Sequence, residues 1–184
     1  MRLLRASDRA PAPWKNGGGV TWELAASPTG AGLDTFDWRI SIAEVAAGGP
    51  FSTFPQIDRI LIVLTGEGMA LDVVGHIPMT LDTTSPPFAF PGDSLCSAKL
   101  VSGAIRDLNV MVRRHRWQAR ARRLNAPDHI ASKATVTILV AATDCQLGEQ
   151  TLQAEDAVRA APGETLQLVW GTAVLIELDT LAAA

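Results

Sequence analysis

Apolar and polar residues alternate along much of this chain with a period of two, which is the pattern of β-strands with one buried face. In the segment 38–45, apolar side chains at positions 38, 40 and 42 oppose Arg39, Ser41 and Ala43. We expect further strands over residues 20–25, 59–64, 69–74, 107–112, 135–142, 165–170 and 173–178. Because Gly- and Pro-rich turns separate these segments, the pattern predicts an all-β sandwich or barrel.

The expected strands fall into two groups along the chain. The segment 113–128 between them is rich in Arg, and we interpret it as a strand that leaves the first group, followed by a linker. A Pro-Gly-acid step leads towards an apolar strand in each group, at 91–93 and at 162–164. This similarity hints at two related β halves, although so short a step also arises by chance.

Composition and charge narrow the classes of function. The 184 residues are 47% hydrophobic and 19% charged, which is ordinary for a globular protein. The net charge of −3 argues against a generally basic nucleic-acid-binding protein, so we expect no nucleic-acid partner. The absence of Tyr removes the phenol as a general acid or base. Cys96 and Cys145 stand far apart without a CxxC pair, and they form no cysteine zinc site by themselves.

The N-terminal residues do not show the pattern of a signal peptide. Arg5 and Asp8 interrupt the apolar run that such a peptide requires. No stretch approaches the roughly 20 apolar residues that a membrane-spanning helix needs. We therefore expect a cytoplasmic protein without a membrane partner.

Polar residues are most concentrated in the first two thirds of the chain, where they occur on strand faces that a simple apolar core would not require to be polar. These segments are Trp14-Lys15-Asn16-Gly17-Gly18-Gly19, Trp38-Arg39-Ile40-Ser41-Ile42-Ala43, Gly49-Pro50-Phe51-Ser52, Asp58-Arg59, Phe90-Pro91-Gly92-Asp93 and Asp107-Leu108-Asn109-Val110-Met111. A barrel gathers such groups from several strands into one pocket.

In this order, the six segments resemble the signature of the HutD/Ves family over roughly residues 12–114. The resemblance implies a bicupin, with two cupin-like β-barrels in one chain: an N-terminal barrel at about 1–118 and a C-terminal barrel at about 130–184. It also implies a role in histidine utilisation, where the HutD branch is thought to sense or sequester an intermediate such as urocanate or formylglutamate. The Ves branch is tied to stress responses. Because cupin-like barrels often pair edge to edge, a homodimer is an open option.

The cupin resemblance allows a test for metal binding. Metal cupins carry a His-x-His pair and a Glu, with a Gly about seven residues after the Glu. Counting back from Gly66 puts Arg59 at the Glu position, and the His positions fall within residues 52–55, none of which is a strong metal ligand. We therefore expect a metal-free pocket without a cofactor. In it, the guanidinium fork of Arg59 would grip a carboxylate with two hydrogen bonds.

These segments predict one ligand-binding pocket in the N-terminal half, for a small carboxylate metabolite. Its residues would be Lys15, Arg39 and Arg59 for positive charge, Asn16, Ser41, Ser52 and Asn109 for hydrogen bonds, and Phe54 and Met111 for apolar walls.

Several of these residues also have plain structural interpretations. Arg39 can form an ion pair with Glu23 rather than contact a ligand. Asp58 can orient the guanidinium of Arg59, or both can lie exposed at the start of a strand. Asn109 can satisfy buried backbone groups.

Three functions are consistent with the sequence. We favour a small-molecule binding protein that regulates histidine utilisation over an enzyme. The enzyme would be a metal-free isomerase or hydrolase with Glu23 or Asp107 as its base, which requires a carboxylate of raised pKa. The third function is a regulatory protein that presents the Arg-rich strip 113–123 to an anionic partner, with positions 114, 116, 118, 120 and 122 on one strand face. A strand edge guarded by positive charge is the plain alternative for that strip.

Overall fold

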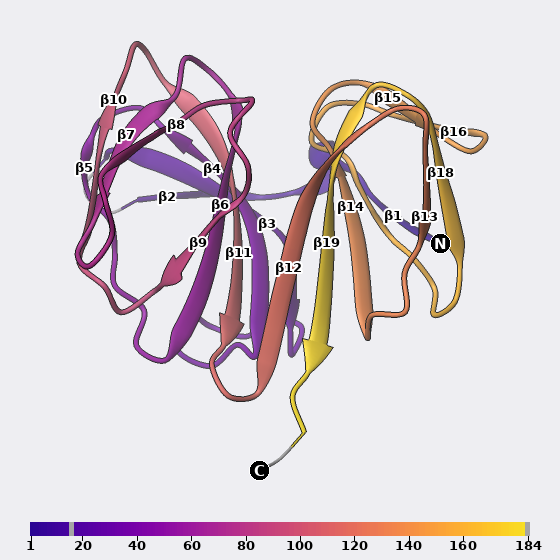
Figure 1. The fold of residues 1–184 in the computed structure, drawn as a ribbon, viewed down its shortest axis with the longest axis horizontal. Helices are drawn as coiled ribbons and strands as arrows, with labels where there is room; N and C mark the ends of the chain where they lie inside the picture. Colours follow the sequence, from indigo (N-terminus) through magenta and orange to yellow (C-terminus); the bar gives the residue numbers. More distant parts are fainter. Residues whose placement is uncertain (15–16, 183–184) are drawn as a thin grey trace. The chain divides into compact units, whose positions relative to one another are not determined.

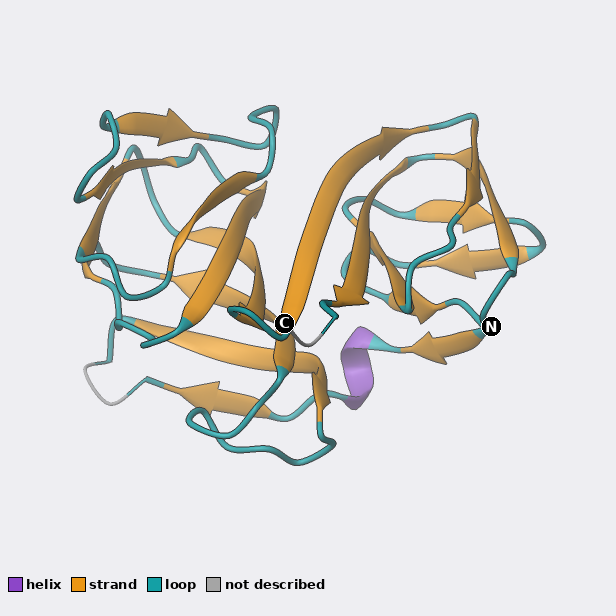
Figure 2. Ribbon diagram, turned by 60° about the horizontal axis from the view of Figure 1, so that its bottom comes forward, coloured by secondary structure: helices purple, strands orange, loops and turns teal. Residues whose placement is uncertain are grey.

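The computed structural model describes residues 1–14 and 17–182, and within these ranges the regular secondary structure is almost entirely β-strand. Figure 2 shows the strands in orange and one short 3-10 turn, η1 (Ala6–Asp8), in purple. No helix in the described ranges is long and apolar enough to cross a membrane. The all-β prediction is confirmed.

The chain divides into two compact units. We call residues Ala10–Arg116 the pocket unit, and we call Met1–Arg9 together with Trp117–Ala184 the terminal unit. The expected N-terminal half of about 1–118 had included the first nine residues. They belong to the terminal unit because β1 (Arg2–Leu4) pairs there with β17 (Ala157–Arg159).

Two antiparallel sheets build the pocket unit, and their strands are labelled in Figure 1. The six-stranded sheet has the order β2 (Pro11–Pro13), β3 (Gly19–Ser27), β4 (Trp38–Val45), β11 (Ile105–Arg113), β6 (Ile57–Thr65) and β9 (Phe88–Pro91). The four-stranded sheet has the order β5 (Gly49–Pro50), β10 (Cys96–Leu100), β7 (Met69–Val73) and β8 (Met79–Leu81).

The terminal unit also contains two sheets. Its five-stranded sheet has the order β1, β17, β14 (Val136–Ala141), β19 (Thr172–Thr180) and β12 (Trp117–Asn125). Its four-stranded sheet has the order β13 (Asp128–Ala131), β18 (Thr165–Trp170), β15 (Cys145–Leu147) and β16 (Gln150–Leu152). The described strands thus form four sheets, and the closed barrels that we expected are not found among them.

The register of the six-stranded sheet aligns polar residues of different strands in rows. Arg39 on β4 pairs with Met111 on β11, which pairs on its other side with Arg59 on β6. Two residues farther along the same two strands, Ser41 on β4 pairs with Asn109 on β11. Because directly paired residues project to the same side and faces alternate along a strand, all five side chains share one face of the sheet.

Farther along these strands, the same face is apolar. Val45 on β4 and Ile105 on β11 pack there with Leu71 on β7 and Ala98 on β10, in a buried cluster that joins the two sheets. The polar rows therefore continue an apolar core rather than face open solvent.

Two expectations for the Arg-rich segment need correction. The segment 113–128 is not a strand followed by a linker: the turn at 114–116 comes first, and β12 then pairs along its whole length with β19 in the terminal unit. The strip 113–123 does not present one continuous face either. Residues 114–116 form a turn in which His115 has a φ of 65°, and this turn breaks the alternation before β12 begins.

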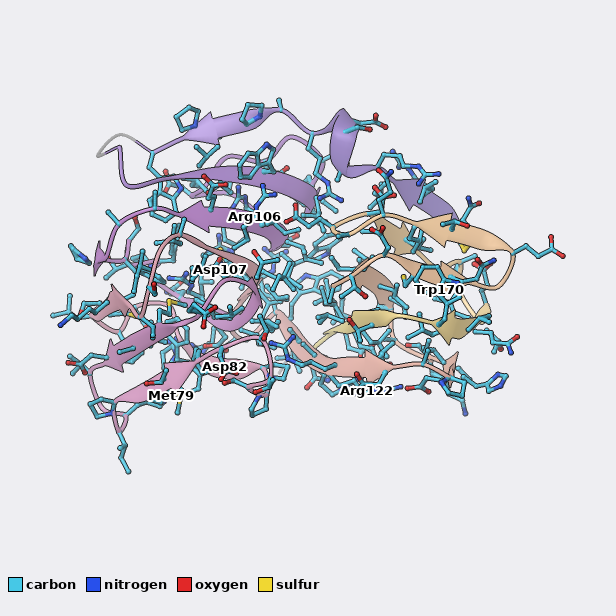
Figure 3. The ribbon with its side chains drawn as sticks, turned by 90° about the horizontal axis from the view of Figure 1, so that it is seen from above. Met79, Asp82, Arg106, Asp107, Arg122 and Trp170 are labelled. Carbon is cyan, nitrogen blue, oxygen red and sulfur yellow. The ribbon has the colours of Figure 1, made fainter. Side chains whose placement is uncertain are left out.

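Carboxylates neutralise much of the charge on this strip. The described ion pairs are Arg114 with Asp58 and Asp93, Arg116 with Asp37, Arg120 with Glu177 and Asp179, and Arg122 with Asp128. Figure 3 marks Arg122 on β12. Arginines that already hold carboxylates have less charge to offer an anionic partner, which weakens the third functional hypothesis.

Candidate functional site

A cavity of about 600 Å³ lies in the pocket unit, against the polar rows of the six-stranded sheet. This volume is in the range of pockets for small molecules. Six polar residues are buried in the described part of the chain, and four of them, Ser41, Arg59, Asp107 and Asn109, line this cavity. The local reason is the period-two pattern of β4, β6 and β11, which turns these polar side chains to the inner face.

Arg59 is the buried cation of the cavity, with only 5% of its surface exposed. Its Nη2 donates to Oδ1 of Asn109 at 2.7 Å, and its Nη1 donates to the backbone carbonyl of Ser52 at 3.4 Å. Its Nε is buried without a hydrogen-bond partner among the described residues. Within those residues, no carboxylate oxygen lies at ion-pair distance from the guanidinium, so its direct partners are neutral oxygens.

Three phenylalanine rings surround the same guanidinium. The Cζ of Arg59 lies 5.6 Å from the ring centroid of Phe51, 5.5 Å from that of Phe54 and 5.1 Å from that of Phe90. Aromatic faces attract a cation at such distances and keep water away from it. The rings therefore hold the guanidinium in an apolar setting, where its charge acts strongly on a ligand.

Asn109 connects Arg59 to a buried carboxyl group. The Nδ2 of Asn109 donates to Oδ1 of Asp107 at 2.6 Å, while its Oδ1 accepts from Arg59. One amide thus bridges a cation on β6 and a carboxyl group on β11. Figure 3 marks Asp107 beside its neighbour Arg106. Arg106 stacks on the ring of Trp22 at 4.5 Å, whereas Asp107 lines the cavity.

Burial changes the ionisation of both ends of this bridge. Asp107 is 1% exposed, and its burial raises the pKa of its carboxyl group to about 7, although the charge of Arg59 and the hydrogen bond from Asn109 act the other way. Burial also lowers the pKa of Arg59, against the opposing charge of Asp107. A guanidinium still keeps its charge at neutral pH. The carboxyl group, in contrast, changes its charge there.

A second guanidinium lies at the cavity on β4. The Nε of Arg39 donates to Oε2 of Glu23 at 2.8 Å, and its Nη1 donates to the hydroxyl of Ser41 at 3.1 Å. The ion pair with Glu23 is present, and Arg39 also lines the cavity. The position of Arg39 is thus compatible both with a structural ion pair and with contact to a ligand.

The apolar lining comes from several segments. Phe54 and Met111, which we expected to form apolar walls, line the cavity together with Trp14. The indole Nε1 of Trp14 donates to the hydroxyl of Thr21 at 2.7 Å, which fixes the ring next to β3. The cavity therefore combines a buried cation with an apolar wall.

Seven of the nine predicted site residues meet at this cavity: Arg39, Ser41, Ser52, Phe54, Arg59, Asn109 and Met111. Lys15 and Asn16 lie outside the described residues. Ser52 differs in one respect, because its backbone carbonyl rather than its hydroxyl holds Arg59.

The interpretation of Asp58 as the group that orients Arg59 is wrong. Asp58 accepts from Nε of Arg114 at 2.8 Å, since successive residues of a strand point to opposite faces. The sequence analysis also missed Phe51 and Phe90 as partners of Arg59. Both residues belong to the motifs given above, and the only indication in the sequence that they lie near the site was the polar residues next to them in those motifs.

The described part of the chain contains no cluster of the side chains that usually bind metal ions. No group of three or more His, Cys, Asp or Glu side chains there is close enough to hold a metal ion. Arg59 also lines the cavity, and its guanidinium has only donors and does not coordinate a cation.

The HutD family model matches residues 6–176. The chain belongs to the HutD family. An uncharacterised 21.2 kDa protein in the hutC 3′ region of Pseudomonas putida is 43% identical over 143 residues, which cover 78% of this HutD-family chain and 74% of that protein. Protein Ves of Citrobacter koseri is 34% identical over 158 residues, which cover 85% of this chain and 81% of that protein. The predicted HutD/Ves membership is confirmed.

Solved structures agree with this HutD-family assignment. HutD from Pseudomonas fluorescens, determined in a formate condition, matches with a TM-score of 0.88 and 32% identity, over 98% of this chain and 99% of that chain. A Cupin 2 conserved barrel domain protein from Leptotrichia buccalis matches with a TM-score of 0.60 at 5% identity, over 98% of this chain and 97% of that chain. The second likeness concerns the fold alone, which is cupin-like.

Proposed function

We propose that this HutD-family chain binds a small carboxylate in the cavity of the pocket unit, and that it regulates histidine utilisation through this binding. The observation that carries the proposal is Arg59: a guanidinium that is 5% exposed, lines a cavity of about 600 Å³ and, among the described residues, donates hydrogen bonds only to neutral oxygens. Urocanate and formylglutamate are the carboxylates that we propose as ligands.

The energetics favour an anionic ligand. A buried cation without an adjacent carboxylate has lost its hydration, and here it has gained neutral hydrogen bonds and aromatic contacts but no direct ionic partner in return. A carboxylate that enters the cavity supplies a direct ionic partner for Arg59, and each charge-assisted hydrogen bond contributes about 1.5–3 kcal/mol. Phe54, Trp14 and Met111 would contact the apolar body of the ligand.

The test is calorimetric titration of the purified protein with formylglutamate, urocanate and formate, and with formamide as an uncharged analogue of formate. We expect the three carboxylates to bind and formamide not to bind. Arg59→Met keeps an unbranched side chain among the phenylalanines but removes the charge. We expect it to weaken carboxylate binding by about 10- to 150-fold, which corresponds to one lost charge-assisted hydrogen bond.

Arg122→Met is the matched control, because Arg122 lies in the terminal unit and pairs with Asp128 there. It should bind carboxylates as the parent protein does. Circular dichroism and thermal unfolding establish that both variants are folded. If folded Arg59→Met kept the parent affinity, the assignment of this cavity would be wrong.

The regulatory part of the proposal needs a separate measurement in the host. An Arg59→Met allele at the native locus should change the expression of the histidine-utilisation genes during growth on histidine, and an Arg122→Met allele should not. Equal expression in the two strains, with the binding defect established in vitro, would separate ligand binding from regulation and refute the latter.

One observation also favours an acid–base enzyme as the second candidate. Asp107 lines the cavity and has a pKa raised to about 7 by burial, which suits a general acid or base at neutral pH. Glu23, the other base that the sequence suggested, already holds Arg39. Incubation of urocanate or formylglutamate with the protein and analysis of the products by mass spectrometry decides between turnover and binding alone.

We also propose that the two units correspond to the two barrels of a bicupin. The support is that each unit contains a pair of antiparallel sheets and that the whole chain is similar in fold to a cupin-domain protein. A crystal structure in which the strands of each unit close into a barrel would establish it.

A further inference from the structure

Among the described residues, the two cations of the cavity and their acidic partners balance in formal charge when both acids are ionised. Arg39 is paired with Glu23, and Arg59 is connected to Asp107 through the amide of Asn109. An anion that binds at Arg59 would therefore meet the negative charge of Asp107 on the far side of a single amide group. In a buried site, two such negative charges repel strongly.

We propose that Asp107 takes up a proton when a carboxylate binds at Arg59, so that the cavity binds its ligand as an anion together with one proton. The inference rests on the proposed function, because it concerns the same cavity and the same ligand class. Its basis is the hydrogen-bonded chain from Arg59 through Asn109 to Asp107, whose three members are 5%, 7% and 1% exposed.

The geometry leaves a place for the proton. Oδ1 of Asp107 accepts from Asn109, while Oδ2 has no hydrogen-bond partner among the described residues. A proton on Oδ2 therefore leaves the existing hydrogen bonds intact. It converts the balanced cavity into one with a net charge of +1, which the ligand carboxylate then neutralises.

Within the described residues, few other ionisable groups lie close to Asp107. In its own row of the sheet, its neighbours are Ala43 on β4 and Val63 on β6, which carry no charge. Cys96 on β10 lies near Arg59, and burial raises the pKa of its thiol, so the thiol is neutral at pH 7. Arg39 is held by Glu23. Asp107 is thus the group whose charge changes near neutral pH, since burial raises its pKa to about 7.

Coupled proton uptake has a simple thermodynamic signature. If binding takes up one proton, the association constant falls by up to tenfold for each pH unit above 7 and levels off below it. Formylglutamate is the suitable probe, because its carboxyl groups do not titrate between pH 6 and pH 9. Urocanate is less suitable, since its imidazole titrates in this range.

The experiment is calorimetric titration of the parent protein with formylglutamate at pH 6, 7, 8 and 9. At each pH, two buffers of different ionisation enthalpy are used, neither of which contains carboxylate or phosphate. The difference in apparent enthalpy gives the number of protons taken up. We expect a value that rises towards one proton per ligand at pH 8. We expect Asp107→Asn to bind with an affinity independent of pH and without proton uptake. The matched control is Asp72→Asn, at an exposed position of β7, and it should behave as the parent does.

The possible results separate the two proposals. Binding by the parent protein without proton uptake, at any pH, would overturn the linkage but leave carboxylate binding intact. Proton uptake that persists in Asp107→Asn would overturn the assignment to Asp107. No binding of formylglutamate, urocanate or formate at any pH would refute the proposed function and the linkage with it.

If Asp107→Asn does not fold, nuclear magnetic resonance of ¹³C-labelled Asp carboxyl groups in the parent protein decides the assignment. One carboxyl signal should titrate near pH 7 and shift to higher pH with ligand, and its absence would overturn the assignment.

Discussion

Asp107→Asn should make the protein's stability less sensitive to pH, even without any ligand. In the folded state, burial raises the pKa of Asp107 to about 7, against an ordinary value of 3.8 for Asp. Between these two values, the folded chain holds a proton that the unfolded chain has lost. A group of this kind stabilises the fold at low pH, and its contribution disappears as the pH rises through about 7.

The magnitude follows from the difference between the two pKa values. One pKa unit corresponds to 1.36 kcal/mol, and integration between pH 5 and pH 8 gives a loss of about 3 kcal/mol from this carboxyl group. Asn cannot ionise, and its Oδ1 can still accept the hydrogen bond from Asn109. The variant should therefore lack this part of the loss, so that its stability relative to the parent rises by about 3 kcal/mol between pH 5 and pH 8.

Urea unfolding at pH 5, 6, 7 and 8, followed by tryptophan fluorescence, measures this difference. All other ionisable groups are common to both chains, so the subtraction of the two curves isolates position 107. Asp72→Asn is again the control, and its curve should run parallel to that of the parent. Parallel curves for Asp107→Asn and the parent would refute the reasoning, because they would show that Asp107 titrates as an exposed carboxyl group does.

Two further predictions concern the framework of each unit. In the pocket unit, a Cβ at Gly92 would lie 2.9 Å from the carbonyl oxygen of Ile57 and 3.3 Å from Cδ of Arg59. Gly92→Ala should therefore destabilise the pocket unit by about 1–3 kcal/mol and weaken carboxylate binding, and wild-type stability in urea would contradict this. In the terminal unit, the buried carboxylate of Asp156 accepts from Nη1 of Arg5 at 2.6 Å and from the amide of Ala6 at 2.8 Å. Burial acts to raise the pKa of Asp156, but these hydrogen bonds outweigh burial and the pKa is lowered. The ionised carboxylate therefore stabilises the fold above the ordinary pKa of Asp, and this stabilisation is lost as the pH falls. Asp156→Ala should cost about 3 kcal/mol at pH 7, and unfolding curves that differ equally at pH 7 and pH 3 would contradict this account.

The strand faces were predictable because they depend on local sequence. The alternation in 38–45 and in 107–112 put Ser41 and Asn109 on the polar faces of their strands, and the structure pairs these two residues directly. The same rule explains the error at Asp58, which precedes Arg59 and must therefore point to the other face of β6. Applied strictly, the alternation would have excluded Asp58 as a partner of Arg59.

The pairing of distant segments was not predictable in this way. Arg59 and Asn109 are 50 residues apart, and their hydrogen bond exists because β6 and β11 are neighbours in the sheet. Phe90 reaches Arg59 because β9 pairs with β6 in the register that sets these two residues opposite each other. No periodicity within one strand contains this information.

The sequence by itself determined that this is an all-β chain of the HutD family and which side chains share a face in segments such as 38–45 and 107–112. Tertiary structure alone decided that Asp107 is connected to Arg59 through Asn109, and that residues 1–9 join the terminal unit rather than the pocket unit. The physical reason is range: the direction of a side chain follows from its neighbours in the strand, whereas strand order and burial, and with them the ionisation of Asp107, depend on contacts made across the whole unit.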